Sequence, residues 1–151
     1  GELAAILSRK RYPAAVSYVA FGIVAFLFTL FWGGTLPDAA IAFPCGLITK
    51  YTVTLAKRFQ TNLFFSNVLS GCFSAVIPVL LGRFFPAVHT DMIIIGTIML
   101  LVPGIAIANV MRDVLAGDTL TALTRLTEVL IVGVGVAVGI AIPLALSHTV
   151  L

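Results

Sequence analysis

The chain has 151 residues, of which 60% are hydrophobic and only 10% are charged, and its mean hydropathy is +1.16. Soluble domains carry about 25% charged residues, so a soluble protein of this length could not cover its surface with so few. The composition therefore predicts an integral membrane protein. The net charge of +3 bears on orientation in the membrane, because the aromatic-interleaved basic patches typical of nucleic-acid binding are absent.

Five stretches are long and apolar enough to cross a bilayer, which takes about 20 helical residues. In chain order they are Ala14–Trp32, Pro37–Ala56, Asn62–Gly82, Met92–Met111 and Thr121–Leu146. The second is the weakest, because its charge-free part ends just before Lys50. We expect an all-α bundle of five transmembrane helices, with residues 1–13 as a cytoplasmic linker and residues 14–151 as the membrane domain.

Basic residues in the predicted loops indicate how the chain is oriented. Eight of the nine Lys and Arg residues fall on one side of the predicted spans, and only Arg83 falls on the other. The eight are Arg9, Lys10, Arg11, Lys50, Lys57, Arg58, Arg112 and Arg125. Because basic loops stay in the cytoplasm, the N-terminus is predicted to be cytoplasmic and the C-terminus to lie outside.

Two spans contain a proline and a glycine at similar depth. Pro103 and Gly104 follow about 12 residues, or roughly 18 Å of helix, into the fourth span, near the middle of a hydrocarbon core about 30 Å thick. Pro44 and Gly46 lie at a comparable depth in the second span. Interrupted spans aligned in this way are typical of a transporter site. Ordinary proline kinks are an equally open interpretation.

The third span carries small and polar residues at spacings of three and four, on one helix face. They are Asn67, Ser70, Gly71, Ser74 and Pro78. Hydrogen bonding between helices, worth roughly 0.6–2 kcal/mol per bond, is favoured over a substrate pathway as the explanation. Gly135 and Gly139 form a GxxxG pair expected to pack inside the bundle. Cys45 and Cys72 are expected to be small packing residues, since no metal-ligand spacing is present.

Charged residues surround the connection between the fourth and fifth spans. Asn109, Arg112, Asp113 and Asp118 come first, and Arg125 and Glu128 follow three residues apart. A solvated hairpin with an ordinary ion pair between Arg125 and Glu128 is one interpretation, and a cytoplasmic gate is the other. Spacing alone favours the hairpin.

The remaining polar residues suggest no enzyme. His89 and His148 are solitary and are expected at the outer interface, and no catalytic set accompanies them. Asp38 is expected in an outer loop, where its neutralisation should have little effect.

The segment VPGIAIANVMRDVLAGDTLTALTRLTEVL resembles the signature of the threonine/serine exporter (ThrE) family, in its YjjP-type half. The matching positions are Pro103, Gly104, Asn109, Arg112, Asp113, Gly117, Asp118, Arg125 and Glu128. The RYP at Arg11 to Pro13 and the five-span layout agree with it, so that the resemblance covers nearly the whole chain.

The resemblance implies a proton-gradient-driven exporter of small polar metabolites in a prokaryotic inner (plasma) membrane. Its substrates would be threonine and serine in one branch and succinate-like dicarboxylates in another. It also implies a soluble domain before the first span, of which GELAAILSRK would be the last turn and linker. The partner would be a second five-span subunit of the YjjB or ThrE-C type, and homo-oligomers are left open. No cofactor, metal or nucleic acid is expected. The alternative is a non-transporting scaffold or assembly subunit of another transport complex.

Two groups of residues are the candidate sites. The substrate path would contain Pro44, Gly46, Asn67, Ser70, Ser74, Pro103, Gly104 and Asn109. The charged gate would contain Arg112, Asp113, Asp118, Arg125 and Glu128. Neutralising Asp113 or Glu128 is expected to reduce export strongly, because an unpaired, partly buried charge is costly.

Overall fold

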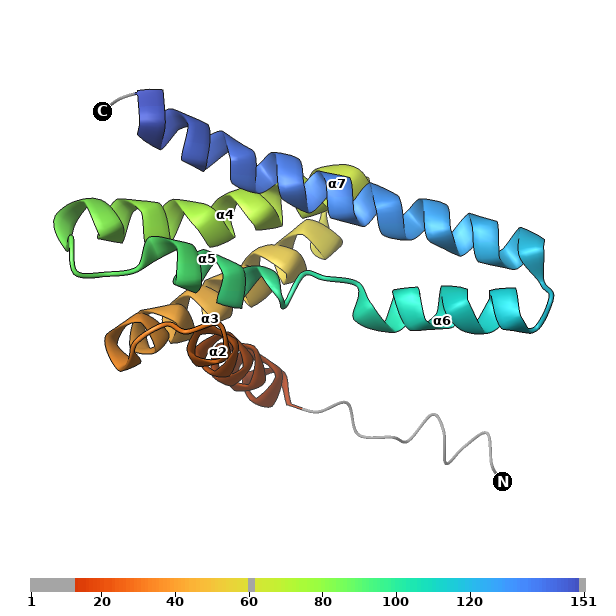
Figure 1. Ribbon diagram of the computed structural model, residues 1–151, viewed down its shortest axis with the longest axis horizontal. Coiled ribbons are helices and arrows are strands. Elements are labelled where there is room, and N and C mark those ends of the chain that lie inside the picture. Colours follow the sequence, from red (N-terminus) through yellow and green to blue (C-terminus); the bar gives the residue numbers. More distant parts are fainter. Residues whose placement is uncertain (1–12, 60–61, 150–151) are drawn as a thin grey trace.

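A computed structural model of the chain describes residues 13–59 and 62–149, and in these ranges all regular structure is helical. The helices are α2 (Ala14–Phe31), α3 (Leu36–Arg58), α4 (Leu63–Phe84), α5 (Thr90–Ile98), α6 (Gly104–Leu115) and α7 (Thr119–Thr149). Figure 1 shows α4, α5 and α7 side by side, with α2 and α3 below them and α6 extending beneath the first half of α7. The all-α prediction is confirmed for these residues.

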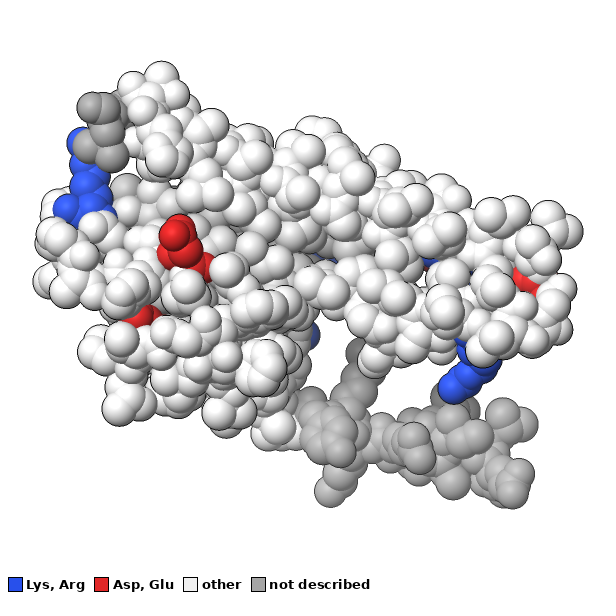
Figure 2. All heavy atoms as spheres, viewed as in Figure 1, with Lys and Arg blue, Asp and Glu red and all other residues white. Residues whose placement is uncertain are grey.

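Four of these helices, α2, α3, α4 and α7, are long and apolar enough to cross a membrane. Their bounds agree within a few residues with four of the five predicted spans. Large apolar side chains cover their outer surfaces, as Phe31 and Phe65 do at 78% and 60% exposed. Figure 2 shows a face whose middle is almost entirely uncharged. Such a surface suits lipid and not water, so the chain is a multi-pass membrane protein.

The predicted span Met92–Met111 is not a single helix. It is divided into α5, of 9 residues, and α6, of 12 residues, by the turn at Met99–Pro103. At 1.5 Å per residue these helices are roughly 14 and 18 Å long, each too short to cross a core of about 30 Å. The interruption predicted at Pro103 and Gly104 is therefore confirmed, whereas the count of five membrane-spanning helices is not. Pro103 explains the break, because it lacks an N–H and disfavours helix in the residue before it.

Helix α3 is continuous through Pro44, so of the two interpretations of Pro44 and Gly46 the interrupted span is wrong. Pro44 lies exposed on the helix surface, and Gly46 packs against α2. A Cβ at Gly46 would lie only 2.7 Å from the carbonyl oxygen of Phe21. The glycine therefore lets the two helix backbones approach closely. Because α3 continues past Gly46, no half-helix with free backbone groups begins or ends there.

Helices α4 and α7 meet through glycines in the same way. A Cβ at Gly71 of α4 would lie 2.7 Å from the Val136 carbonyl oxygen of α7. In return, a Cβ at Gly139 of α7 would collide with the Val68 carbonyl oxygen, and one at Gly135 would lie 3.0 Å from that of Phe64. The GxxxG pair packs within the bundle, as predicted.

A second contact region joins α2, α3 and α5. Its buried residues are Ala25, Ala42, Cys45 and Ile93. Cys45 is 1% exposed and serves as a small packing residue, as expected.

The α6–α7 hairpin extends away from the other helices (Figure 1). Helix α6 ends at Leu115, and Gly117 follows with a φ of +80°. That left-handed conformation strains residues with a Cβ, so glycine allows the tight turn back into α7.

Candidate functional site

One ion pair joins the two arms of the α6–α7 hairpin. Arg125 Nη1 of α7 lies 3.1 Å from Asp113 Oδ2 of α6. The Asp113 side chain is 19% exposed and that of Arg125 is 46% exposed. The Oδ2 atom has no well-aligned hydrogen bond within the described part of the chain, although solvent does not reach it. Asp113 therefore depends on the positive charge of Arg125 for its stabilisation.

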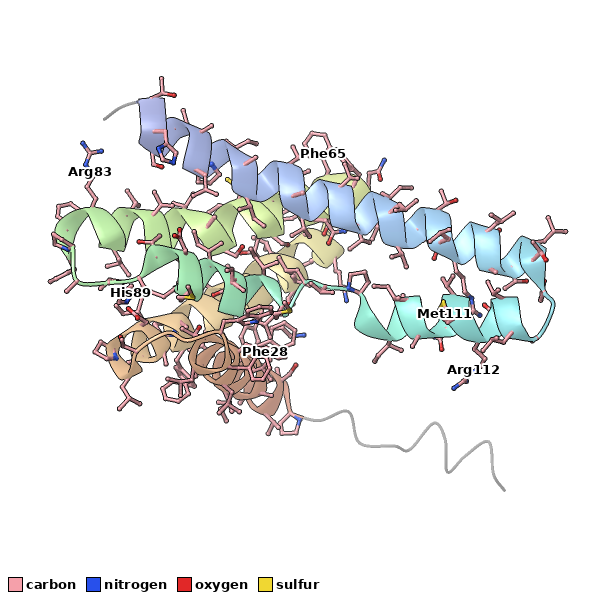
Figure 3. All side chains as sticks on the ribbon, in the orientation of Figure 1. Phe28, Phe65, Arg83, His89, Met111 and Arg112 are labelled. Atoms are coloured by element: carbon pink, nitrogen blue, oxygen red, sulfur yellow. The ribbon has the colours of Figure 1, made fainter. Side chains whose placement is uncertain are left out.

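The other members of the predicted gate do not join this pair. Arg125 turns toward Asp113, so the expected pair between Arg125 and Glu128 is not formed. Glu128 and Arg112 are exposed, and Figure 3 shows Arg112 pointing away from α7.

Asp118 caps the start of α7. Its Oδ2 accepts a hydrogen bond from Thr121 Oγ1 at 2.8 Å, and its Oδ1 accepts one from the Thr121 amide at 3.2 Å. These bonds from Thr121 hold the pKa of Asp118 below its ordinary value. The carboxylate thus accepts a hydrogen bond from an amide at the helix N-terminus, where its negative charge also interacts favourably with the positive end of the helix dipole. This structural role explains its place in the motif.

The break between α5 and α6 borders an apolar groove against α7. The groove has a volume of about 510 Å³. Val102 and Pro103 line one side, and Gly133 and Val134 of α7 line the other. A Cβ at Gly104 would meet open space, and Asn109 is half-buried one turn and a half further on. The break is thus accessible, but the groove beside it offers almost no polar surface.

The polar residues of α4 bond to their own helix. Asn67 Nδ2 donates to the Leu63 carbonyl at 2.7 Å. Ser70 Oγ donates to Ser66 and Ser74 Oγ to Gly71, each at 2.8 Å. Ser70 and Ser74 are both 1% exposed. Their hydroxyl donors are satisfied inside the bundle, which favours helix packing over a polar pathway.

The predicted path residues therefore lie in different surroundings. Pro103 lines the apolar groove, whereas Gly46 lies in the contact between α2 and α3 and Ser74 is buried on α4.

Asp38 forms a polar centre that the sequence analysis missed. It is 0% exposed, and it lies within α3 and not in an outer loop. Its Oδ2 accepts hydrogen bonds from the Thr35 amide at 2.8 Å and the Thr35 hydroxyl at 2.7 Å. Its Oδ1 accepts one from the His89 amide at 3.0 Å, and His89 Nδ1 lies 3.0 Å from Oδ2. The expectation that Asp38 is peripheral and His89 solitary is wrong.

A local signal could have revealed half of this arrangement. Thr35 and Asp38 are three residues apart just before an apolar helix and form a capping box. The contribution of His89 had no such signal, because it is 51 residues away along the chain.

These features define a class of protein before any comparison. Long apolar helices, an interrupted apolar segment and an ion pair between two helices are features found in membrane transporters. Among known families, residues 1–147 match the one described as "Putative threonine/serine exporter". The chain belongs to this ThrE family, as its signature from Pro103 to Glu128 indicated, and the family is one of transporters. No curated protein and no solved structure matches the chain.

Proposed function

We propose that the chain is a membrane subunit of a secondary exporter of small polar metabolites, driven by the proton gradient in a prokaryotic inner membrane. Threonine and serine are the first substrates to test, and succinate-like dicarboxylates are the second. The observation that carries the proposal is the family match over residues 1–147.

In this proposal α5 and α6 cross the membrane together as one interrupted segment. Their combined helical length of roughly 30 Å equals the thickness of the hydrocarbon core. The amides of Ile105 and Ala106 open the second half-helix and have no acceptor in the described part of the chain. Free amides near the middle of a membrane are suited to binding a solute. Pro103, Gly104 and Asn109 then border the path.

The charged pair Asp113–Arg125 is the proposed gate. Breaking the pair costs Asp113 more free energy than Arg125, because Asp113 is the more buried of the two. Arg125 retains access to water without Asp113, whereas Asp113 without Arg125 is left with its Oδ2 inaccessible and unpaired. Opening the hairpin must therefore bring water or a new cation to Asp113.

The second five-span subunit, of the YjjB or ThrE-C type, is proposed to cover the α6–α7 hairpin. Ile105, Leu115 and Leu120 are 82%, 84% and 80% exposed there. They cover an arm that only α7 supports, so a single chain encloses little space for a sealed pathway. A second copy of this chain could cover the same surface, and copurification of the partner distinguishes the two.

The test is efflux of preloaded threonine, serine and succinate from cells that express this chain with its partner. Arg125→Gln should reduce export by about tenfold or more, since about 1.4 kcal/mol of lost stabilisation corresponds to tenfold. Asp113→Asn should have a smaller effect, because Arg125 can be solvated. Glu128→Gln should matter least of the three, because Glu128 is exposed outside the pair.

Arg58→Gln is the matched control, since Arg58 is an exposed arginine at the end of α3. Membrane levels must be equal for all variants. Export by Arg125→Gln at the parental rate would remove the gate from the proposal. If the parent itself exports none of the three solutes, the scaffold alternative holds.

A further inference from the structure

A second groove lies at the end of the molecule opposite the α6–α7 turn, between the end of α4, the start of α5 and the end of α7 (Figure 1). Its volume is about 600 Å³. Val79 and Leu144 contribute to its apolar wall, and Arg83, Asp91 and Ser147 bring polar groups to it from three helices.

Two residues of opposite charge, Arg83 and Asp91, line this groove. Within residues 13–59 and 62–149, neither Arg83 nor Asp91 has an ion-pair partner. Figure 3 shows Arg83 pointing from the end of α4 toward the C-terminal end of α7. A guanidinium and a carboxylate beside apolar walls interact more strongly with a ligand than they would in water.

We propose that this groove binds an α-amino acid in its zwitterionic form. Arg83 holds the carboxylate, for which its planar fork of donors is suited, and Asp91 holds the ammonium group. The substrate side chain lies along Val79 and Leu144. The proposal rests on the proposed function and gives that function a substrate site, away from the signature residues of α6 and α7.

Two hydroxyl groups favour serine and threonine over other amino acids. Ser147 Oγ donates to the Leu144 carbonyl at 2.7 Å, so its lone pairs can accept a hydrogen bond from a substrate hydroxyl. Thr90 also lines the groove, and its Oγ1 occupies the space that a Cβ at Gly82 would take. A Cβ at Gly82 would collide with that hydroxyl, so a glycine at this position leaves room for the Thr90 side chain.

The same charges exclude dicarboxylates. Asp91 repels the second carboxylate of succinate, whereas it attracts the ammonium group of serine. The groove therefore decides between the two substrate classes of the proposed function, in favour of amino acids.

Equilibrium binding to the full chain in lipid nanodiscs, measured by calorimetry, tests the site. Serine and threonine should bind, while succinate, which lacks the ammonium group, and ethanolamine, which lacks the carboxylate, should bind at least about tenfold more weakly. Arg83→Gln and Asp91→Asn should each weaken serine binding by roughly tenfold or more, and Arg83→Lys should restore part of it. Arg58→Gln should bind like the parent.

Efflux measured with the same variants distinguishes failure of the proposed binding site from failure of the proposed exporter function. If the parent exports serine while Arg83→Gln and Asp91→Asn bind and export it normally, the site is wrong and the exporter function stands. Tighter succinate binding than serine binding overturns the zwitterion assignment. If the parent neither binds nor exports amino acids, the function fails and the site fails with it. Gly82→Ala gives an independent check, because displacing Thr90 should weaken serine binding without removing a charge.

Discussion

The carboxylate of Asp38 connects two parts of the molecule that are distant in sequence. Thr35, at the start of α3, and His89, before α5, both donate to it. Because the side chain of Asp38 is fully buried, no water can replace these donors at its carboxylate. One residue thus fixes the relative position of two helix starts.

Asp38→Asn should destabilise the ligand-free protein by about 2 kcal/mol or more. The amide NH2 of asparagine is a donor, and it would replace one of the two oxygens that now accept hydrogen bonds from Thr35 and His89. Thermal unfolding in detergent measures this. Asp91→Asn makes the same change of charge at an exposed position of α5 and should leave the melting temperature nearly unchanged. Equal melting temperatures for Asp38→Asn and the parent would mean that the hydrogen bonds around Asp38 contribute little.

The sequence identified the charged residues of the hairpin but not their partners. Helical spacing suggested that Arg125 pairs with Glu128, whereas the tight turn at Gly117 brings Asp113 within 3.1 Å. A pairing across a turn depends on how the two helices rotate about their axes. Spacing along one helix carries no information on that rotation, and the same holds for His89 and Asp38.

At the scale of helices, hydropathy predicted α2, α3, α4 and α7 well, because a membrane requires about 20 apolar residues per crossing. Prolines were harder to interpret. Pro103 ends a helix, whereas α3 continues past Pro44. Both prolines lie in apolar sequence within two residues of a glycine, and neighbouring helices decide whether the freed backbone groups are tolerated. The sequence alone does not show those neighbours.

Glycines on α7 provide a matched test of helix packing. Gly139→Ala should destabilise the protein by about 1–3 kcal/mol, because its Cβ would overlap the backbone of α4 at Val68. Gly133→Ala lies in open space on the same helix and should leave stability unchanged or slightly higher. Thermal unfolding of both variants gives the comparison. A tolerated Gly139→Ala would show that α4 and α7 can separate without cost.

At the scale of the whole molecule, three connections mark two opposite ends. The connections from α2 to α3 and from α4 to α5 lie toward the end where α7 finishes, and the α6–α7 turn lies at the other (Figure 1). That division suits the orientation predicted from the basic residues, in which the α6–α7 turn is cytoplasmic.

Cysteine labelling tests this orientation. In a chain with Cys45 and Cys72 replaced by alanine, Ala87→Cys, in the exposed α4–α5 connection, should react with an impermeant thiol reagent added outside intact cells. Ala116→Cys, in the α6–α7 turn, should react only after the cells are opened. The reverse pattern would invert the orientation. Reaction of both positions from outside would mean that α5 and α6 do not cross the membrane together.

The glycine contact between α4 and α7 also has a mechanical consequence. Backbones that touch directly leave no side chains to change rotamer between them, so sliding or rotation would either collide or open a void. Helices α4 and α7 would therefore move as one rigid body during a transport cycle. The parts that would move relative to this body are α5 and the first turns of α6, which are joined by the short turn at Met99–Pro103. That short segment would be the hinge of the molecule, with the far end of α6 held to α7 by Asp113 and Arg125.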